Sequence, residues 1–255
     1  MEEKKATPPK KRVTFYVDGF NFYYGLRDQS ALDSSWKKYY WIDLVFFFEQ
    51  FLKPDEELIE VRYFTARPKN NGKMTRQNLF MEVNKKLHKG KFKIHYGKYQ
   101  EKHIKCLGTC KDRFVTYEEK ETDVHIAVKL IEDCVFGASD RIVLVSADSD
   151  LMPPIRFIAD YCKKNNLEKD MTILFPPMHY SSALNNFGYP VIQLGKYESR
   201  FKKALLPKTV NFKDNSIYQI PANWDIEYPK ELADKIFDER EKILAATTAP
   251  LATKK

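Results

Sequence analysis

Long hydrophobic runs are absent from this sequence. The longest apolar candidate starts at Leu44 and is interrupted by Glu49, well short of the roughly 20 residues that a transmembrane helix needs. The first residues are charged and lack the apolar stretch of a secretory signal peptide. These absences predict a cytoplasmic protein that has no membrane partner.

Cysteine is also scarce, with four residues in the chain. Cys134 and Cys162 lie among apolar residues, which is typical of ordinary buried thiols. His103, Cys106 and Cys110 have types and spacing that zinc accepts, but no second cysteine pair lies near them. The sequence therefore leaves two interpretations open for this stretch, a zinc site or free thiols in a loop.

Aromatic residues, in contrast, are abundant at 14% of the 255 residues, and this composition excludes a disordered chain. The length suffices for one α/β domain with an added tail. Strand-like and helix-like segments alternate, which predicts a parallel sheet with helices on both faces. The predicted strands are 13–17, 57–65, 92–99, 141–145, 171–175 and 191–194, with a polar insertion over 106–114. Residues 205–224 are expected to be an extended tail that docks on the domain, and 231–244 a terminal helix.

Acidic residues follow the predicted strands. Asp18 ends the first strand, Asp123 lies in the first turn of a helix, and Asp148 and Asp150 follow the buried strand 141–145. If the first and fourth strands are neighbours, Asp18 and Asp148 face each other at the sheet edge where ligands bind. Carboxylates suit Mg²⁺ or Mn²⁺ better than zinc. The simpler interpretation of Asp150 is a cap on the next helix.

Three segments resemble the signatures of the NYN domain, a branch of the PIN-like nucleases. They are Val-Asp-Gly-Phe-Asn at 17–21, Glu-Lys-Glu-Thr-Asp-Val at 119–124 and Leu-Val-Ser-Ala-Asp-Ser-Asp at 144–150. The resemblance implies a Rossmann-like (PIN-like) three-layer α/β sandwich, with a mostly parallel sheet of order about 3-2-1-4-5, and a ribonuclease centre that uses Mg²⁺ or Mn²⁺. The resemblance covers the expected nuclease domain at 12–195. The composition predicts a disordered basic segment at 1–11 before it, and a docking extension at 196–255 that is disordered at its end.

The resemblance further implies roles for single residues. Asp18, Asp123 and Asp148 fall on the metal-binding positions, and Asp150 on a further acidic position, so all four are candidate catalytic residues. Asn21 matches the position that orients the first Asp, and Ser146 matches a polar residue beside the site.

The positive charge is concentrated in one part of the chain. Residues 66–105 hold twelve Lys and Arg against Glu82 and Glu101, a net charge of +10 within a total of +8. A basic segment beside an acidic cluster fits a protein that binds a polyanion, although a solvated helix face would look similar. We expect Arg67, Lys73 and Arg76 to guide a single-stranded RNA toward the acids.

The leading hypothesis from the sequence is therefore a metal-dependent ribonuclease. An RNA-binding or regulatory scaffold with a weak or inactive site is the alternative. A phosphatase of another Rossmann-like family is a third hypothesis, although Asp18 is followed by Gly-Phe-Asn and not by the Asp-x-Asp pattern of such enzymes. Whether the protein is a monomer or a homodimer stays open.

Overall fold

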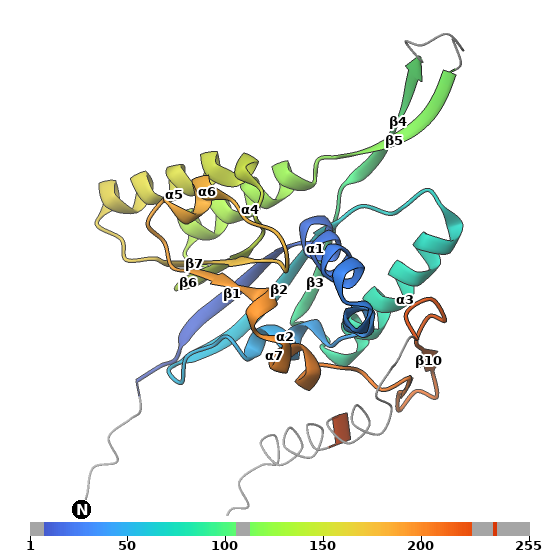
Figure 1. Ribbon diagram of the computed structural model, residues 1–255. Helices are drawn as coiled ribbons and strands as arrows, with labels where there is room; N and C mark the ends of the chain where they lie inside the picture. The colour runs from blue at the N-terminus through green and yellow to red at the C-terminus, as the bar shows by residue number, and fades with distance from the viewer. Residues whose placement is uncertain (1–7, 106–112, 226–236, 239–255) are drawn as a thin grey trace, which may run out of the picture.

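A six-stranded parallel sheet forms the centre of the molecule (Figure 1). The computed structural model describes residues 8–105, 113–225 and 237–238. The strand order is β3-β2-β1-β6-β7-β8, and every neighbouring pair is parallel. When only the strands of this sheet are numbered, the predicted order 3-2-1-4-5 is confirmed and is extended by one edge strand. The bounds are β1 Lys11–Asp18, β2 Glu56–Thr65, β3 Phe92–Tyr96, β6 Arg141–Val145, β7 Asp170–Phe175 and β8 Val191–Gln193.

Helices cover both faces of the sheet, so the predicted three-layer α/β sandwich is confirmed. Alternate side chains of β1 divide between two cores: Phe15 packs toward α1, α2 and α3, whereas Tyr16 packs toward α4 and α5. Cys134 of α4 and Cys162 of α5 bring their Sγ atoms to 3.6 Å. The helices are α1 Gly19–Leu32, α2 Leu44–Glu49, α3 Asn71–Leu87, α4 Thr122–Phe136, α5 Met152–Asn165, α6 Ser182–Asn185 and α7 Glu198–Lys203, and the 3₁₀ turns are η1 Ser34–Tyr40, η2 Ser149–Leu151 and η3 Leu194–Lys196.

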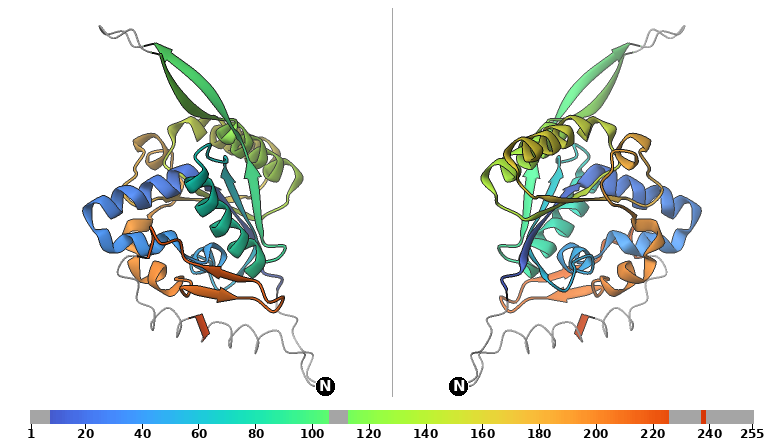
Figure 2. Two further views of the ribbon diagram at one scale, coloured as in Figure 1. Left: turned by 90° about the vertical axis from the view of Figure 1, so that its right-hand side faces the viewer. Right: turned by 90° about the vertical axis from the view of Figure 1, so that its left-hand side faces the viewer.

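A β-hairpin projects from the sheet, and the sequence did not predict it (Figure 2). It consists of β4 Lys98–Lys105 and β5 Arg113–Lys120, paired antiparallel. The prediction of one strand over 92–99 was wrong because the chain turns at Gly97, where a Cβ would lie 2.6 Å from Lys120 O. His103 of β4 pairs with Glu101 at 3.0 Å. Cys106 and Cys110 lie outside the described residues, so the zinc question stays open.

The segment after β8 packs back on the α1, α2 and α3 face. Phe201 is fully buried, with its ring 4.2 Å from that of Phe47, and Trp41 Nε1 donates a hydrogen bond to Pro207 O at 2.8 Å. Trp224 is buried in the same core. Two short strands, β9 Thr209–Asn211 and β10 Ile217–Gln219, form an antiparallel ribbon over this region. The described part of the extension thus belongs to the main hydrophobic core.

The two chain ends are described only in part. β1 begins at Lys11, whose N–H donates to Asp55 O at 2.9 Å, and residues 1–7 lie outside the described residues. The helix predicted over 231–244 lies outside them too, except for residues 237–238. Within the described residues, none of the helices is long and apolar enough to cross a bilayer.

Candidate metal centre

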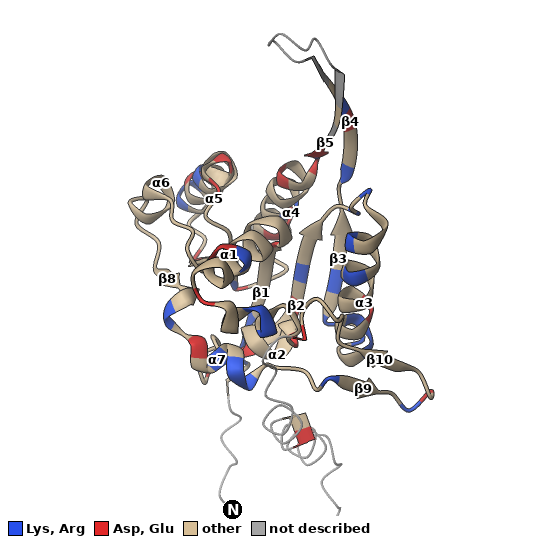
Figure 3. Ribbon diagram, turned by 45° about the vertical axis from the view of Figure 1, so that its right-hand side comes forward, with Lys and Arg blue, Asp and Glu red and all other residues tan. Residues whose placement is uncertain are grey.

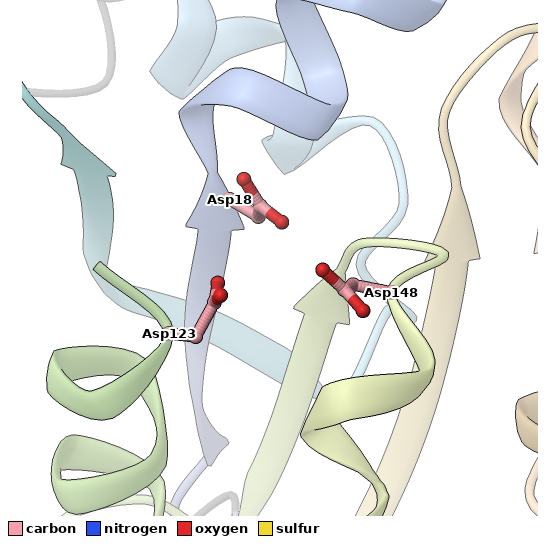
Figure 4. Close-up of side chains that lie close together, drawn as sticks. All are labelled: Asp18, Asp123 and Asp148. Carbon is pink, nitrogen blue, oxygen red and sulfur yellow. The ribbon is translucent and has the colours of Figure 1, made fainter. Parts of the chain in front are cut away.

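Three carboxylates meet at the carboxyl edge of the sheet (Figure 4). Asp18 ends β1, Asp148 follows the neighbouring strand β6, and Asp123 lies in the first turn of α4. One oxygen from each of the three lies within 4.8 Å of the others. The structure thereby brings together three of the four acids that the sequence singled out.

The Asp18–Gly19 pair explains how a strand and a helix meet so closely at this point. Asp18 is the N-cap of α1, and its Oδ1 accepts a hydrogen bond from Asn21 N at 3.0 Å. A Cβ on residue 19 would lie 2.4 Å from a ring carbon of Tyr63 and 2.6 Å from Phe64 O. Only glycine allows α1 to start directly at the end of β1 against β2.

Hydrogen bonds hold the carboxylates in place. Ser146 Oγ donates to Asp18 Oδ2 at 2.9 Å and accepts from Asp148 N at 3.0 Å, so one hydroxyl joins two of the acids. The Asn21 side chain does not contact Asp18; its Oδ1 accepts from Ala147 N at 3.0 Å. Asn21 thus connects α1 to the loop that carries Asp148.

The environment disfavours negative charge on two of the three acids. Burial raises the pKa of Asp18 to about 7, against the hydrogen bonds from Asn21 and Ser146, and repulsion from Asp123 and Asp148 adds to the rise. The pKa of Asp123 rises to about 6 because of burial and then repulsion from Asp148, Glu119 and Asp150. Among the described residues, none of the ion pairs involves these three carboxylates. Within the described parts of the chain, the negative charge of this site is therefore not balanced by an ion pair.

A divalent cation fits this centre. All three converging groups are carboxylates, the ligand type that Mg²⁺ and Mn²⁺ prefer, and among the residues that the structure describes no cysteine or histidine joins the group. A cation would also remove the repulsion that raises the two pKa values. The donor set does not distinguish Mg²⁺ from Mn²⁺.

Asp150 occupies a different place from the other acids. It is exposed, its backbone N–H donates to Asp148 Oδ1 at 2.8 Å, and its charge contributes to the raised pKa of Asp123. The expectation that Asp150 caps the next helix was wrong: the N-cap of α5 is Leu151, which makes no side-chain cap bond, and Asp148 caps the short η2 turn before it. Asp150 is thus near the centre but outside the converging group.

Sequence reasoning missed two residues beside the centre. Glu119 accepts a hydrogen bond from Thr122 N at 3.2 Å and repels Asp123, and its position in the 119–124 segment was a usable signal. His179 lies 3.1 Å through Nδ1 from Asn21 Oδ1, in the loop after β7. No local pattern marks His179, because its partner is far away in the sequence.

The three predicted RNA-binding residues line two different hollows, and Lys and Arg are frequent along α3 (Figure 3). Lys73 and Arg76 line a cavity of about 340 Å³ between α1 and α3. Arg67 instead stacks over the ring of Tyr96 at 4.7 Å and lines a separate groove between α3 and β3. The structure thus separates Arg67 from the other two.

Comparisons with known proteins place the chain in a family. The chain is 26% identical over 190 residues to 6-hydroxy-3-succinoylpyridine 3-monooxygenase HspA of Pseudomonas putida (strain DSM 28022 / S16), an alignment of 62% of this chain and 58% of that protein. A crystal structure of a protein of unknown function from Vibrio parahaemolyticus RIMD 2210633 aligns with a TM-score of 0.49 and 19% identity, over 73% of this chain and 94% of the other. The NYN domain matches residues 12–171. The chain therefore belongs to the NYN domain family, within the PIN-like nuclease superfamily.

Proposed function

We propose that this protein is a metal-dependent ribonuclease that hydrolyses phosphodiester bonds of single-stranded RNA. The observation that carries the proposal is the convergence of ligand oxygens of Asp18, Asp123 and Asp148 within 4.8 Å, at a place where none of the described residues forms an ion pair with them. Membership of a nuclease superfamily supports the same reaction class. The reaction would consume water and leave two shorter RNA chains.

Each side chain at the carboxylate centre would have its own role in the reaction. Asp18, Asp123 and Asp148 would hold Mg²⁺ or Mn²⁺, which supplies charge neutralisation at the phosphate and a more acidic water. Ser146 joins the carboxylate of Asp18 to the backbone N–H of Asp148 through its two hydrogen bonds, which fixes the loop that carries Asp148 beside Asp18. Asp150, exposed beside Asp123, is free to accept a proton from water at the open side of the centre.

Substitution of Asp148 tests the proposal. We expect Asp148→Asn to weaken Mn²⁺ binding by at least about ten-fold, because loss of an outer partner alone costs that much. Cleavage of a single-stranded RNA panel should require Mg²⁺ or Mn²⁺, stop in EDTA and be lost in the variant. Asp160→Asn, an exposed acid on α5, is the matched control. If calorimetry shows the same Mn²⁺ affinity for Asp148→Asn and wild type, the proposed metal site is wrong.

The assay also tests the scaffold alternative. A scaffold would bind the RNA panel in EDTA and leave it uncut with either metal.

A second candidate function comes from the Pseudomonas relative, whose name describes a monooxygenase that acts on a substituted pyridine. The observation in its favour is the aromatic lining of the cavity between α1 and α3, which would suit a small ring compound. Oxygen consumption with a hydroxypyridine and a two-electron donor, unchanged in Asp148→Asn, would support this function over RNA hydrolysis.

A further inference from the structure

The cavity between α1 and α3 is walled by aromatic rings from distant parts of the chain. Its volume is about 340 Å³, at the lower end of the range for small-molecule pockets. Tyr23 and Tyr24 of α1 line it and are 40% and 39% exposed overall, so part of each ring is open to solvent, although Arg27 lies over the Tyr24 ring at 4.4 Å from its centroid. Phe20 contacts Tyr24 and Tyr99 with ring centroids at 6.4 and 6.0 Å, which extends the aromatic wall to the hairpin.

Trp224 completes the wall from the C-terminal segment. Its ring lies 5.7 Å from that of Tyr40 and 6.3 Å from that of Phe80, and it is buried in the main core. The C-terminal extension therefore supplies part of the cavity wall.

Positive charge lines the same cavity. Lys73, Arg76 and Arg27 all contribute to its lining, and the charges of Arg76 and Arg27 oppose the rise in the pKa of Tyr23. Lys73 and Arg76 take part in none of the ion pairs formed within the described parts of the chain. Aromatic rings with unpaired cations beside them match a planar base attached to a phosphate.

The cavity lies next to the carboxylate centre. Gly19 lines it and directly follows Asp18. On another side Tyr99 lines it and pairs across the hairpin with Glu119, whose charge reaches Asp123. An RNA strand that places a phosphate at the carboxylates would therefore have an adjoining base beside the cavity.

We propose that this cavity is a nucleobase subsite, in which one base of the RNA strand stacks on Tyr23 and Tyr24 while Lys73 and Arg76 bind the adjoining phosphates. The assignment rests on the proposed ribonuclease function and names the part of the substrate that the enzyme recognises. Because stacking accepts every base, the subsite would give affinity with weak sequence preference.

The test separates base binding from phosphate binding and from cleavage. Two probes are titrated in EDTA: a pentamer of uridine and an abasic ribose-phosphate oligomer with the same number of phosphates. We expect wild type to bind the uridine pentamer roughly ten-fold more tightly than the abasic oligomer, within the range for a stacked base. Tyr23→Leu/Tyr24→Leu should abolish this difference, and Phe157→Leu, an exposed aromatic on α5, should preserve it.

The protein carries its own fluorescent reporter for the same titration. Trp36 and Trp41 are buried elsewhere in the core, so we expect the uridine pentamer to quench emission from Trp224 and Trp224→Phe to remove the quenching. Mn²⁺ affinity should be unchanged in Tyr23→Leu/Tyr24→Leu, which confirms that the variant is folded.

The outcomes distinguish the subsite from the catalytic proposal. Equal affinity for both oligomers, or an undiminished preference in Tyr23→Leu/Tyr24→Leu, would overturn the subsite even if RNA is cleaved with metal. Failure of wild type to bind either oligomer, or binding of a hydroxypyridine without binding of RNA, would overturn it as well. A base preference that disappears in the variant supports the subsite, and loss of cleavage in Asp148→Asn is measured separately.

Discussion

The surroundings of Asp123 disfavour the negative charge that its proposed role as a metal ligand requires. Asp123 lies in the first turn of α4, where the helix dipole favours a negative charge by at most about 1 kcal/mol. Burial and three neighbouring acids work against that charge and raise its pKa to about 6. We expect Asp123→Asn to melt at the same temperature as wild type or higher, while RNA cleavage falls at least about a hundred-fold. Near-wild-type cleavage would reduce Asp123 to a helix-dipole residue.

The same carboxylate makes the stability of the metal-free protein depend on pH. Its folded pKa of about 6 exceeds the ordinary 3.8, so the folded state binds more protons between these values and loses stability as pH rises through them. At pH 5 Asp123 is mostly protonated and resembles asparagine, whereas at pH 8 it is charged and repelled. We expect the melting-temperature advantage of Asp123→Asn in EDTA to be larger at pH 8 than at pH 5.

Thermal melting of wild type, Asp123→Asn and Asp160→Asn at both pH values measures this effect. Asp160→Asn should differ from wild type equally at the two values, because Asp160 is exposed. Equal shifts for Asp123→Asn at pH 5 and 8 would contradict the raised pKa. Added Mn²⁺ should reverse the order at pH 8, since wild type retains the full set of ligands.

Local sequence located the acids because each follows or begins a recognisable element. Asp18 ends one strand that is apolar on both faces, and Asp148 follows another. Such strands are typical of a parallel sheet, and ligands bind at the carboxyl edge of these sheets. The same reasoning could not distinguish Asp150 from the other acids. Asp150 lies two residues after Asp148 but is not part of the converging group. His179 escaped it, and the rings against which Trp224 docks could not be named, because contacts across more than a hundred residues leave no local pattern.

At the scale of elements, α3 carries cations that we expect to bind RNA, whereas the acids that we expect to hold the metal lie on other elements. Lys73 and Arg76 line the cavity beside the centre, and Arg67 lies in another groove. We expect Lys73→Gln/Arg76→Gln to flatten the dependence of log affinity on log salt by roughly 1.4, at about 0.7 per phosphate contact. Mn²⁺ affinity should not change, because α3 carries none of the acids. RNA affinity is measured at several salt concentrations in EDTA for wild type, Lys73→Gln/Arg76→Gln and the control Arg67→Gln. If Arg67→Gln flattens the slope as much, the RNA does not bind specifically at the cavity that Lys73 and Arg76 line.

The hairpin is the element that the sequence could not predict. The sheet strands are marked by buried apolar residues, but Val115 and Tyr117 of β5 are 52% and 45% exposed. A ribbon with both faces open to water has no reason to alternate apolar and polar residues, so the periodicity that reveals buried strands is absent. Its base matters nevertheless, because Tyr99 and Glu119 adjoin the cavity and the carboxylates.

At the scale of the whole molecule, the core extends beyond the residues that match the family. The NYN match ends at 171, whereas Phe201 and Trp224 are buried against the first half of the chain. We expect Phe201→Ala to lower the free energy of unfolding by about 3–5 kcal/mol, the usual cost of deleting a buried ring. Phe136→Ala, where the ring is 80% exposed, should change it by less than about 0.5 kcal/mol. Urea unfolding gives both values, and similar midpoints for the two variants would mean that the extension contributes little to the core.

The packing of Trp41 against the extension has a consequence for synthesis on the ribosome. Trp41 and Phe47 emerge early, but Pro207 and Phe201, which cover them, are translated much later. At about 5–20 residues per second, the nascent chain would carry this uncovered aromatic surface for roughly 10–30 s. Throughout that interval chaperones could bind the uncovered aromatic surface. Slow translation of the last third of the chain would lengthen the time during which this surface can aggregate.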